Sequence, residues 1–424
     1  MKKDRNIENE IVQLAALIGT GLMTNGAETY RVEDSMQSIM ESYDDILTNP
    51  QVFGITHYIT ISAQNRSGDT IVVTENVRGV ITNFNRVDLL NNLTRRICRE
   101  KPDPALALAD AKAILAFPRY SQLINTGGVA LTGFSFTLLS GSTLIPAIWA
   151  AVVSALLTFM VSPLRRLGSN RIFINIIRGA LVYAMISPVL FTQYSSQVHL
   201  MTAGAFMYLF PGIILVNSIR DLIASDYLAG LIKLIETILA ATALAIGSGI
   251  GSSIMNYIFR FTHTELPPLY SIDPMNPVSV MIAILGVFAF LIIFDVRKQA
   301  LLVGGVGGGL SWLIYALINH YSDFNYTVAI FIATLFLATY SELMARVTKK
   351  PATVYLTAGL FPLVPGYEIY RTMNYFLTGQ ENSFINSLIK TLMITGTLAL
   401  GIMLVSSIAK LFYNYKAAHR LKEQ

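Results

Sequence analysis

Apolar residues dominate the chain from Ser121 onward, where they form runs of membrane-spanning length. A helix needs about 20 mostly apolar residues to cross a bilayer. Ten runs approach that length, near 121–139, 143–161, 172–191, 199–217, 228–250, 278–294, 300–318, 327–345, 352–369 and 385–407. The pattern predicts a polytopic α-helical membrane protein with ten transmembrane helices.

In the first 120 residues, apolar residues alternate with polar and charged ones, as in a domain that faces water. Apolar residues recur at helical spacing over 11–22 and predict a first helix. A second helix is expected to begin near Asn25. Its apolar face consists of Val32, Met36, Ile39, Met40 and Tyr43.

Two β-branched runs follow these helices. They cover 54–64 and 69–77, and the turn-forming residues 65–69 between them predict a hairpin. A third amphipathic helix over 83–100 and a short helix ending near Phe117 complete the pattern. We therefore expect an N-terminal α+β domain.

The chain is expected to have three parts. Residues 1–118 form the N-terminal domain, 119–270 a first five-helix block, and 271–424 a second block with a short tail. The start is charged, and the apolar patch Leu14–Met23 lacks a cleavage site, so it does not match a secretory signal. We expect the N-terminal domain to stay in the cytoplasm.

Charge indicates the orientation. Charged residues make up 13% of the chain, against roughly 25% in an average soluble protein. With the N-terminus inside, the cytoplasmic loops and tail hold Arg165, Arg166, Arg171, Arg220, Arg297, Lys298, Arg346, Lys349, Lys350, Lys410, Lys416, Arg420 and Lys422, and the external loops hold Arg260 and Arg371. The positive-inside rule then predicts a multi-pass cell-membrane protein with both termini cytoplasmic. The net charge of +5 needs no nucleic-acid partner to explain it.

The two five-helix blocks share a short motif. "LFPG" (Leu209–Gly212) lies in the fourth apolar run and "LVPG" (Leu363–Gly366) in the ninth, and each is followed by "LIK" at the start of the next run. Since five is odd, the second block would enter the membrane inverted. Inverted repeats with Pro/Gly-interrupted helices are typical of secondary transporters. The alternative is that Pro and Gly are simply frequent in membrane helices.

Motifs of soluble enzymes are missing. The sequence has no GxGxxG, GxxxxGK[ST], HExxH or GxSxG pattern. "GGVGGG" (Gly304–Gly309) lies inside an apolar run, where it favours close helix packing. The five histidines are scattered, and Cys98 is the single cysteine. We expect a semi-buried Cys98, no metal site and no cofactor.

Charged residues inside apolar runs are costly in hydrocarbon and are candidates for function. Arg178 and Glu236 lie deepest, and we expect them to line a pathway. Lys233 lies three residues before Glu236, close enough to pair with it. Lys233 and Lys390 are near helix ends, so snorkelling to the headgroups remains an alternative. Because a buried carboxylate has a raised pKa, Glu236 and Glu342 are the proton-coupling candidates.

The richest segment is "PGIILVNSIRDLIASDYLAGLIKLIETILAATALAIG". It contains Pro211, Gly212, Asn217, Arg220, Asp221, Asp226, Gly230, Lys233 and Glu236. This spacing resembles the threonine/serine exporter family. "GAETYRVEDSM", with Glu28, Tyr30, Arg31 and Glu33, and the "RG" at Arg78-Gly79 are similar to that family as well.

The resemblance covers nearly the whole chain and implies export of threonine and serine driven by the proton-motive force. In some relatives the two halves are separate proteins, and one such pair resembles a succinate exporter, so a small dicarboxylate is the alternative substrate. The implied partners are a small molecule and the lipid bilayer, and a homo-oligomer is compatible with them.

The Pro-Gly motifs suggest where the substrate lies. Pro211 and Pro365 cannot donate backbone hydrogen bonds, so each helix is expected to be interrupted beside Gly212 or Gly366. The freed backbone groups would then hold a zwitterion. Arg220-Asp221 is expected at the cytoplasmic mouth, either for gating or as a positive-inside anchor.

The cluster in "MTNGAETYRVEDSM" has a local explanation. Asn25 is placed to cap a helix, with Glu28 reaching back in a capping box, and Arg31 can pair with Glu28. It does not explain every residue, because Tyr30 and Glu33 lie off the apolar face and folding does not require these residue types there. Glu28, Glu33 and Asp34 also suggest a membrane-anchored enzyme with a hydrolytic cytoplasmic domain, but no nucleophile accompanies them.

Overall fold

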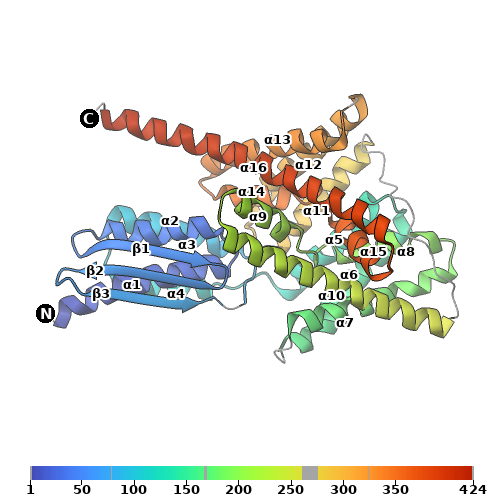
Figure 1. Cartoon of the computed structure of the whole chain (residues 1–424), viewed down its shortest axis with the longest axis horizontal. Helices are drawn as coiled ribbons and strands as arrows, with labels where there is room; N and C mark the ends of the chain where they lie inside the picture. The colour runs from blue at the N-terminus through green and yellow to red at the C-terminus, as the bar shows by residue number, and fades with distance from the viewer. Residues whose placement is uncertain (1, 78, 167–169, 260–275, 323, 423–424) are drawn as a thin grey trace. The chain divides into compact units, whose positions relative to one another are not determined.

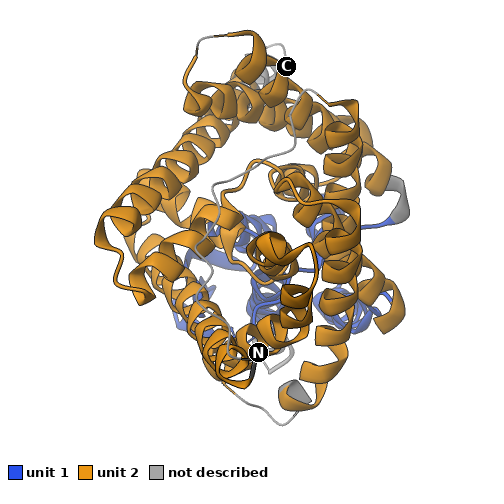
Figure 2. Ribbon diagram, turned by 90° about the vertical axis from the view of Figure 1, so that its right-hand side faces the viewer, with its two compact units in different colours: residues 1–120, 294–297 blue, residues 121–293, 298–424 orange. Residues whose placement is uncertain are grey.

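The computed structural model describes residues 2–77, 79–166, 170–259, 276–322 and 324–422 (Figure 1). The chain divides into two compact units (Figure 2). Unit 1 consists of Met1–Tyr120 and Phe294–Arg297, and unit 2 of Ser121–Ile293 and Lys298–Gln424. Arg78 of the "RG" motif, the expected external basic residue Arg260 and the expected boundary at 270 lie outside the described residues.

Unit 1 has three layers, a sheet and two pairs of helices. The antiparallel sheet has the order β1-β2-β3 and consists of β1 (Leu47–Ile55), β2 (Tyr58–Asn65) and β3 (Thr70–Asn76). The helices are α1 (Lys2–Thr24), α2 (Thr29–Ser42), α3 (Phe84–Glu100) and α4 (Pro104–Ala116). Helices α1 and α2 pack against the sheet, and α3 and α4 pack against them. The inward residues Ile59, Ile61 and Ala63 of β2 are buried, as alternation on one covered face requires.

The short segment Phe294–Arg297 is held inside unit 1 by polar contacts. The Asp295 carboxylate lies 2.5 Å from Arg119 Nε and accepts a hydrogen bond from the Tyr120 amide at 2.7 Å. Arg297 Nε donates to Asn85 Oδ1 at 2.5 Å. The connection between α11 (Pro277–Ile293) and α12 (Lys298–Tyr321) is therefore part of unit 1.

Two expectations for unit 1 were wrong. Strand β1 was not expected, because it contains Pro50, which cannot donate a backbone hydrogen bond to a neighbouring strand. In the structure, Asn49 has a positive φ (48°), and the pairing of β1 with β2 shifts register between Thr48 and Gln51. Helix α2 begins at Thr29 instead of Asn25, and its N-cap residue Glu28 makes no side-chain capping bond. The Asn25 side chain instead donates to the Gly21 carbonyl at 2.7 Å, so the capping box does not form.

Among the described residues of unit 2, all regular secondary-structure elements are helices. Its α-helices are α5 (Gln122–Leu139), α6 (Leu144–Arg166), α7 (Arg171–Ile186), α8 (Val198–Phe206), α9 (Gly212–Ile223), α10 (Tyr227–Phe259), α11 (Pro277–Ile293), α12 (Lys298–Tyr321), α13 (Tyr326–Thr348), α14 (Ala352–Gly359), α15 (Gly366–Leu377) and α16 (Glu381–Lys422). Within the described ranges, six helices are long and apolar enough to cross a membrane, and α11 is a shorter apolar helix. This agrees with a polytopic helical membrane protein.

The helices of unit 2 pack in a reciprocal pattern. Helix α10 packs against α7, α9 and α15, whereas α16 packs against α13, α15 and α9. Each long helix thus contacts the short helix before it and the short helix of the other half. The expected role of "GGVGGG" is confirmed, since a Cβ added to Gly308 would lie 3.1 Å from the Gly359 Cα of α14.

Candidate functional site

Two interrupted helices lie in unit 2 where the Pro-Gly motifs predicted them. Helix α8 ends at Phe206 and α9 begins at Gly212, with Pro211 as its N-cap residue at φ −79° and ψ 42°. Helix α14 ends at Gly359 and α15 begins at Gly366, with Pro365 at φ −78° and ψ 52°. The two breaks therefore share one backbone geometry.

The two breaks touch each other. A Cβ added to Gly212 would lie 2.4 Å from Val364 Cγ1 in the second break, and one added to Gly366 would lie 2.5 Å from Met207 Sδ in the first. A Cβ at position 212 would clash with the stiff Val364 side chain, whereas one at position 366 would require the flexible Met207 side chain to move. The buried Tyr370 ring of α15 adds to this contact, 5.9 Å from Phe206 and 6.3 Å from Phe210.

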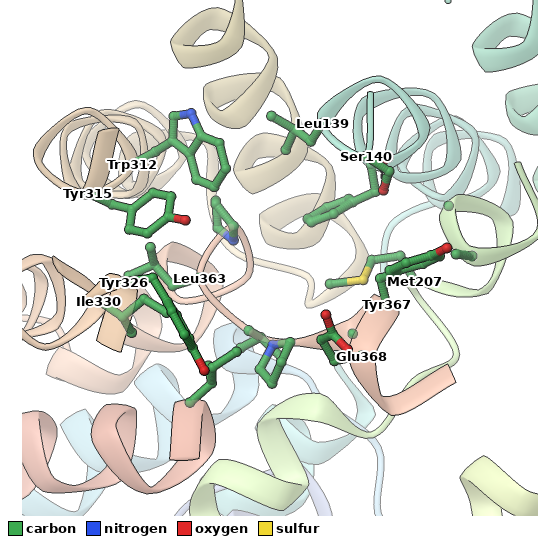
Figure 3. Close-up of a pocket in the computed structure, with 18 of the residues that line it drawn as sticks. Leu139, Ser140, Met207, Trp312, Tyr315, Tyr326, Ile330, Leu363, Tyr367 and Glu368 are labelled. Carbon is green, nitrogen blue, oxygen red and sulfur yellow. Dashed lines mark hydrogen bonds between the residues drawn. The ribbon is translucent and has the colours of Figure 1, made fainter. Parts of the chain in front are cut away.

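A cavity of about 420 Å³ adjoins the second break. Figure 3 shows Trp312, Tyr315 and Tyr326 on one side of it and Ser140, Met207 and Tyr367 on the other, with Glu368 between them. The remaining lining residues are Phe136, Leu139, Ala203, Gly204, Ile330, Pro362, Leu363, Val364, Pro365, Gly366, Lys390 and Ile394. Aromatic walls with a few polar groups and a helix start are typical of a small-molecule site.

Glu368 carries the negative charge of this cavity. The residue is only 6% exposed, and its Oε1 lies 2.7 Å from Lys390 Nζ on α16. Ser387 Oγ donates to Oε2 at 3.2 Å, and Arg371 Nη1 lies 3.7 Å from Oε1. A buried carboxylate needs such partners, because an unpaired buried charge costs several kcal/mol.

A second ion pair joins α9 to α10. Lys233 Nζ lies 2.5 Å from Asp221 Oδ2, and Arg220 Nη2 lies 3.9 Å from Asp221 Oδ1. Ser218 Oγ donates to the Gly230 carbonyl at 2.7 Å between the same two helices. In both halves, a lysine of the long helix thus binds an acidic residue of the preceding short helix.

Comparison with known proteins decides the family. The family model described as "Putative threonine/serine exporter" matches residues 13–255, and the one described as "Threonine/Serine exporter, ThrE" matches residues 279–408. The chain belongs to the threonine/serine exporter family. Together the two models cover unit 1 from residue 13 onward, both breaks and the residues that line the cavity.

Curated relatives agree with the family. The chain is 22% identical over 381 residues to the "Probable threonine/serine exporter" of Mycobacterium tuberculosis, covering 87% of this chain and 70% of that protein. It is 24% identical over 421 residues to the "Threonine/serine exporter" of Corynebacterium glutamicum, covering 94% and 82%. These relatives are exporters and not enzymes. No solved structure matches the chain.

The predicted site residues of this family member fall into separate groups. Pro365 and Gly366 line the cavity. Arg220, Asp221 and Lys233 form the α9–α10 pair. Two further residues complete that region, namely Asn217, half-buried on α9, and Asp226, whose Oδ1 accepts from the Ala229 amide at 3.3 Å.

The other predicted membrane charges are not among the residues that line the cavity. Arg178 donates to Asn175 Oδ1 at 3.0 Å on its own helix. Glu342 lies 3.7 Å from Arg346 one turn later. Glu236 is half-buried on α10. Lys233, expected near Glu236, instead binds Asp221.

Two placements need correction. Arg371 was expected in an external loop but lies in α15, where its Nη2 donates to the Tyr375 hydroxyl at 2.7 Å. Arg220 was expected in a cytoplasmic loop but is buried in α9. A loop assignment fails for both because each break starts a second short helix that extends the apolar run.

Sequence reasoning missed Glu368, the acidic residue of the cavity. A signal was present, because Glu368 is an acidic residue three positions after Pro365 within an apolar run. Its partner Lys390 was identified, but with snorkelling left open. In the structure, Lys390 pairs with Glu368 in the cavity wall.

The N-terminal motif of the family lies at the start of α2 in unit 1. Arg31 Nε lies 3.0 Å from Glu28 Oε2, which confirms the expected pair. Partial burial, and then the Glu28 carboxylate, raise the pKa of the Tyr30 phenol to about 12. Glu33 Oε1 accepts a hydrogen bond from the Gly54 amide of β1 at 2.8 Å, which links α2 to the sheet. Among the described residues, no group of three or more His, Cys, Asp or Glu could hold a metal ion.

Proposed function

We propose that the chain is a secondary transporter that exports threonine, serine or a similar small hydroxy amino acid. The observation that carries the proposal is the contact between the two Pro-Gly breaks beside a cavity that contains Glu368 and Lys390. Breaks in membrane helices free backbone groups and helix ends to bind a charged substrate. The family membership and the names of both relatives support the same substrate class.

We propose further that unit 2 consists of two inverted five-helix repeats with ten membrane crossings. The reciprocal packing of α10 and α16 supports this, as do the matching geometries of Pro211 and Pro365. In such a repeat, α5 to α10 correspond to α11 to α16. Rocking of one repeat against the other about the two contacting breaks would expose the site alternately to the two sides of the membrane.

The proposed orientation places unit 1 in the cytoplasm. Phe294–Arg297, the connection between α11 and α12, belongs to unit 1. This supports the placement of that connection and the N-terminal residues on the same side of the membrane. Ser140, Tyr326 and Lys390 then lie toward the external ends of their helices, and the Asp221–Lys233 pair toward the cytoplasmic end.

A substrate panel tests the function. The full chain is reconstituted in proteoliposomes, and counterflow is measured with labelled threonine, serine and succinate under an imposed pH gradient. We expect saturable flux of threonine or serine. Flux of succinate alone would show that the substrate class is a small dicarboxylate. If the well-folded protein transports none of the three compounds, the proposal is overturned.

Proton coupling is proposed to use Glu236, with Glu342 as the second candidate. Glu236→Gln removes a titratable carboxylate from α10 while keeping its size. We expect this variant to lose threonine efflux driven by a pH gradient and to keep threonine exchange at equal pH. Unchanged pH-driven efflux would remove Glu236 from the coupling role, and Glu342→Gln would be measured in the same way.

A further inference from the structure

In the Glu368–Lys390 ion pair, Glu368 is buried and held in place, whereas Lys390 is accessible. Glu368 is buried and held by Ser387 Oγ at 3.2 Å as well as by Lys390 Nζ at 2.7 Å. The Lys390 side chain is 40% exposed, and its Nζ lies 5.6 Å from the centroid of the Tyr326 ring. Because a lysine stem is long and flexible, Lys390 is the partner that can move.

We propose that the amino-acid substrate inserts its zwitterion into this ion pair. The substrate ammonium binds Glu368, and the substrate carboxylate binds the displaced Lys390. This assignment rests on the proposed function and names the residues that hold the substrate. In the empty carrier Lys390 occupies the ammonium subsite.

Charge balance favours insertion. A zwitterion brings one charge of each sign, so each charge of the Glu368–Lys390 pair exchanges one partner for another. No charge is left unpaired in the cavity, which would cost several kcal/mol. Substrate binding therefore does not have to overcome the desolvation of a new net charge.

Neighbouring groups suit the same orientation. Helix α15 starts at Gly366 in the cavity wall, and the N-terminal end of a helix attracts a carboxylate. The Tyr367 hydroxyl is buried, and no described residue is placed to hydrogen-bond it. That hydroxyl can donate to the substrate carboxylate or bond the hydroxyl of its side chain.

The arrangement selects against ligands that carry one kind of charge. A dicarboxylate such as succinate would place a carboxylate against Glu368 or leave Glu368 bound to Lys390. An amine without a carboxylate would displace Lys390 and leave it without a partner. The inferred ligand class is therefore a small α-amino acid.

Competition by analogues tests the insertion. Threonine counterflow is measured against 1-amino-2-propanol, which keeps the ammonium, and against 3-hydroxybutyrate, which keeps the carboxylate. Neither should compete in the wild-type protein. In Lys390→Gln, Glu368 loses its closest cationic partner and keeps only the more distant Arg371, whose Nη1 lies 3.7 Å from Oε1, so 1-amino-2-propanol should gain at least about tenfold in affinity. In Glu368→Gln, Lys390 lacks its partner, so 3-hydroxybutyrate should gain by a similar factor.

Binding can also be followed without transport. Trp312 lines the cavity, and in a Trp149→Phe background its fluorescence reports ligand binding even where a variant no longer transports. Lys410→Gln provides the matched control, because Lys410 is an exposed lysine on the same helix. This control should show the analogue pattern of the wild-type protein.

The outcomes separate the two proposals. Reciprocal gains of the two analogues support insertion. Variants that lose threonine without gaining either analogue, or that bind all ligands as the wild type does, overturn it while the transport function stands. A wild-type protein that neither binds nor transports threonine or serine overturns the proposed function itself.

Discussion

Glu33 belongs to α2, but its carboxylate stabilises β1. Strand β1 is an outer strand that pairs only with β2, and the Gly54 amide of β1 donates to Glu33 Oε1 at 2.8 Å. An outer strand presents unpaired backbone groups that need another partner. One charged residue of the family motif therefore has a structural role in unit 1.

We predict that Glu33→Ala weakens β1 locally. Loss of the acceptor leaves a buried amide unsatisfied, which costs about 1–3 kcal/mol. Hydrogen–deuterium exchange of the purified full chain should show faster exchange over residues 47–55. Glu33→Gln keeps an acceptor oxygen, and Asp34→Ala changes an exposed acidic residue of the same helix, so both should exchange as the wild type does. Unchanged exchange in Glu33→Ala would show that another contact holds this edge.

At the scale of elements, α7 and α10 pack through glycines. A Cβ added to Gly247 of α10 would lie 2.0 Å from the Ile176 carbonyl oxygen, and one added to Gly179 of α7 would lie 2.3 Å from the Leu244 carbonyl oxygen. Small residues let membrane helices approach closely, and van der Waals contact then stabilises the pair. Backbone atoms form both close contacts, so a side-chain rotation cannot relieve them.

We predict that Gly247→Ala separates α7 from α10 and destabilises the protein by about 1–3 kcal/mol, the usual cost of overpacking. Its melting temperature in detergent should fall. Gly249 lies two residues later on the same helix, and a Cβ there meets nothing within 4 Å. Gly249→Ala should therefore keep the melting temperature, and equal effects of the two variants would contradict this account.

Sequence patterns predicted the secondary-structure elements better than they predicted the contacts between residues. Hydropathy placed the apolar runs, and proline chemistry predicted the breaks at Pro211 and Pro365. Spacing along one helix reveals partners three or four residues apart, as for Glu28 and Arg31. Lys390 and Glu368 are 22 residues apart on different helices, so their pairing follows from tertiary packing and could not be read from spacing.

At the scale of the whole molecule, the orientation in the membrane determines on which side of the bilayer the Glu368–Lys390 and Asp221–Lys233 pairs lie. The positive-inside rule and the proposed cytoplasmic placement of unit 1 lead to one arrangement. It puts the β2–β3 hairpin inside and the α15–α16 connection outside. Ser67 is exposed in the hairpin and Gln380 is exposed in the connection, so both are accessible to a reagent.

We predict that these two positions react from opposite sides. In a Cys98→Ser background, which removes the single native cysteine, Gln380→Cys should react with a membrane-impermeant maleimide on intact cells. Ser67→Cys should react only after permeabilisation. The reverse result would invert the topology and place the Glu368 cavity on the cytoplasmic side, where it would receive the substrate first. Reaction of both positions on intact cells would contradict the separation of unit 1 from the external face.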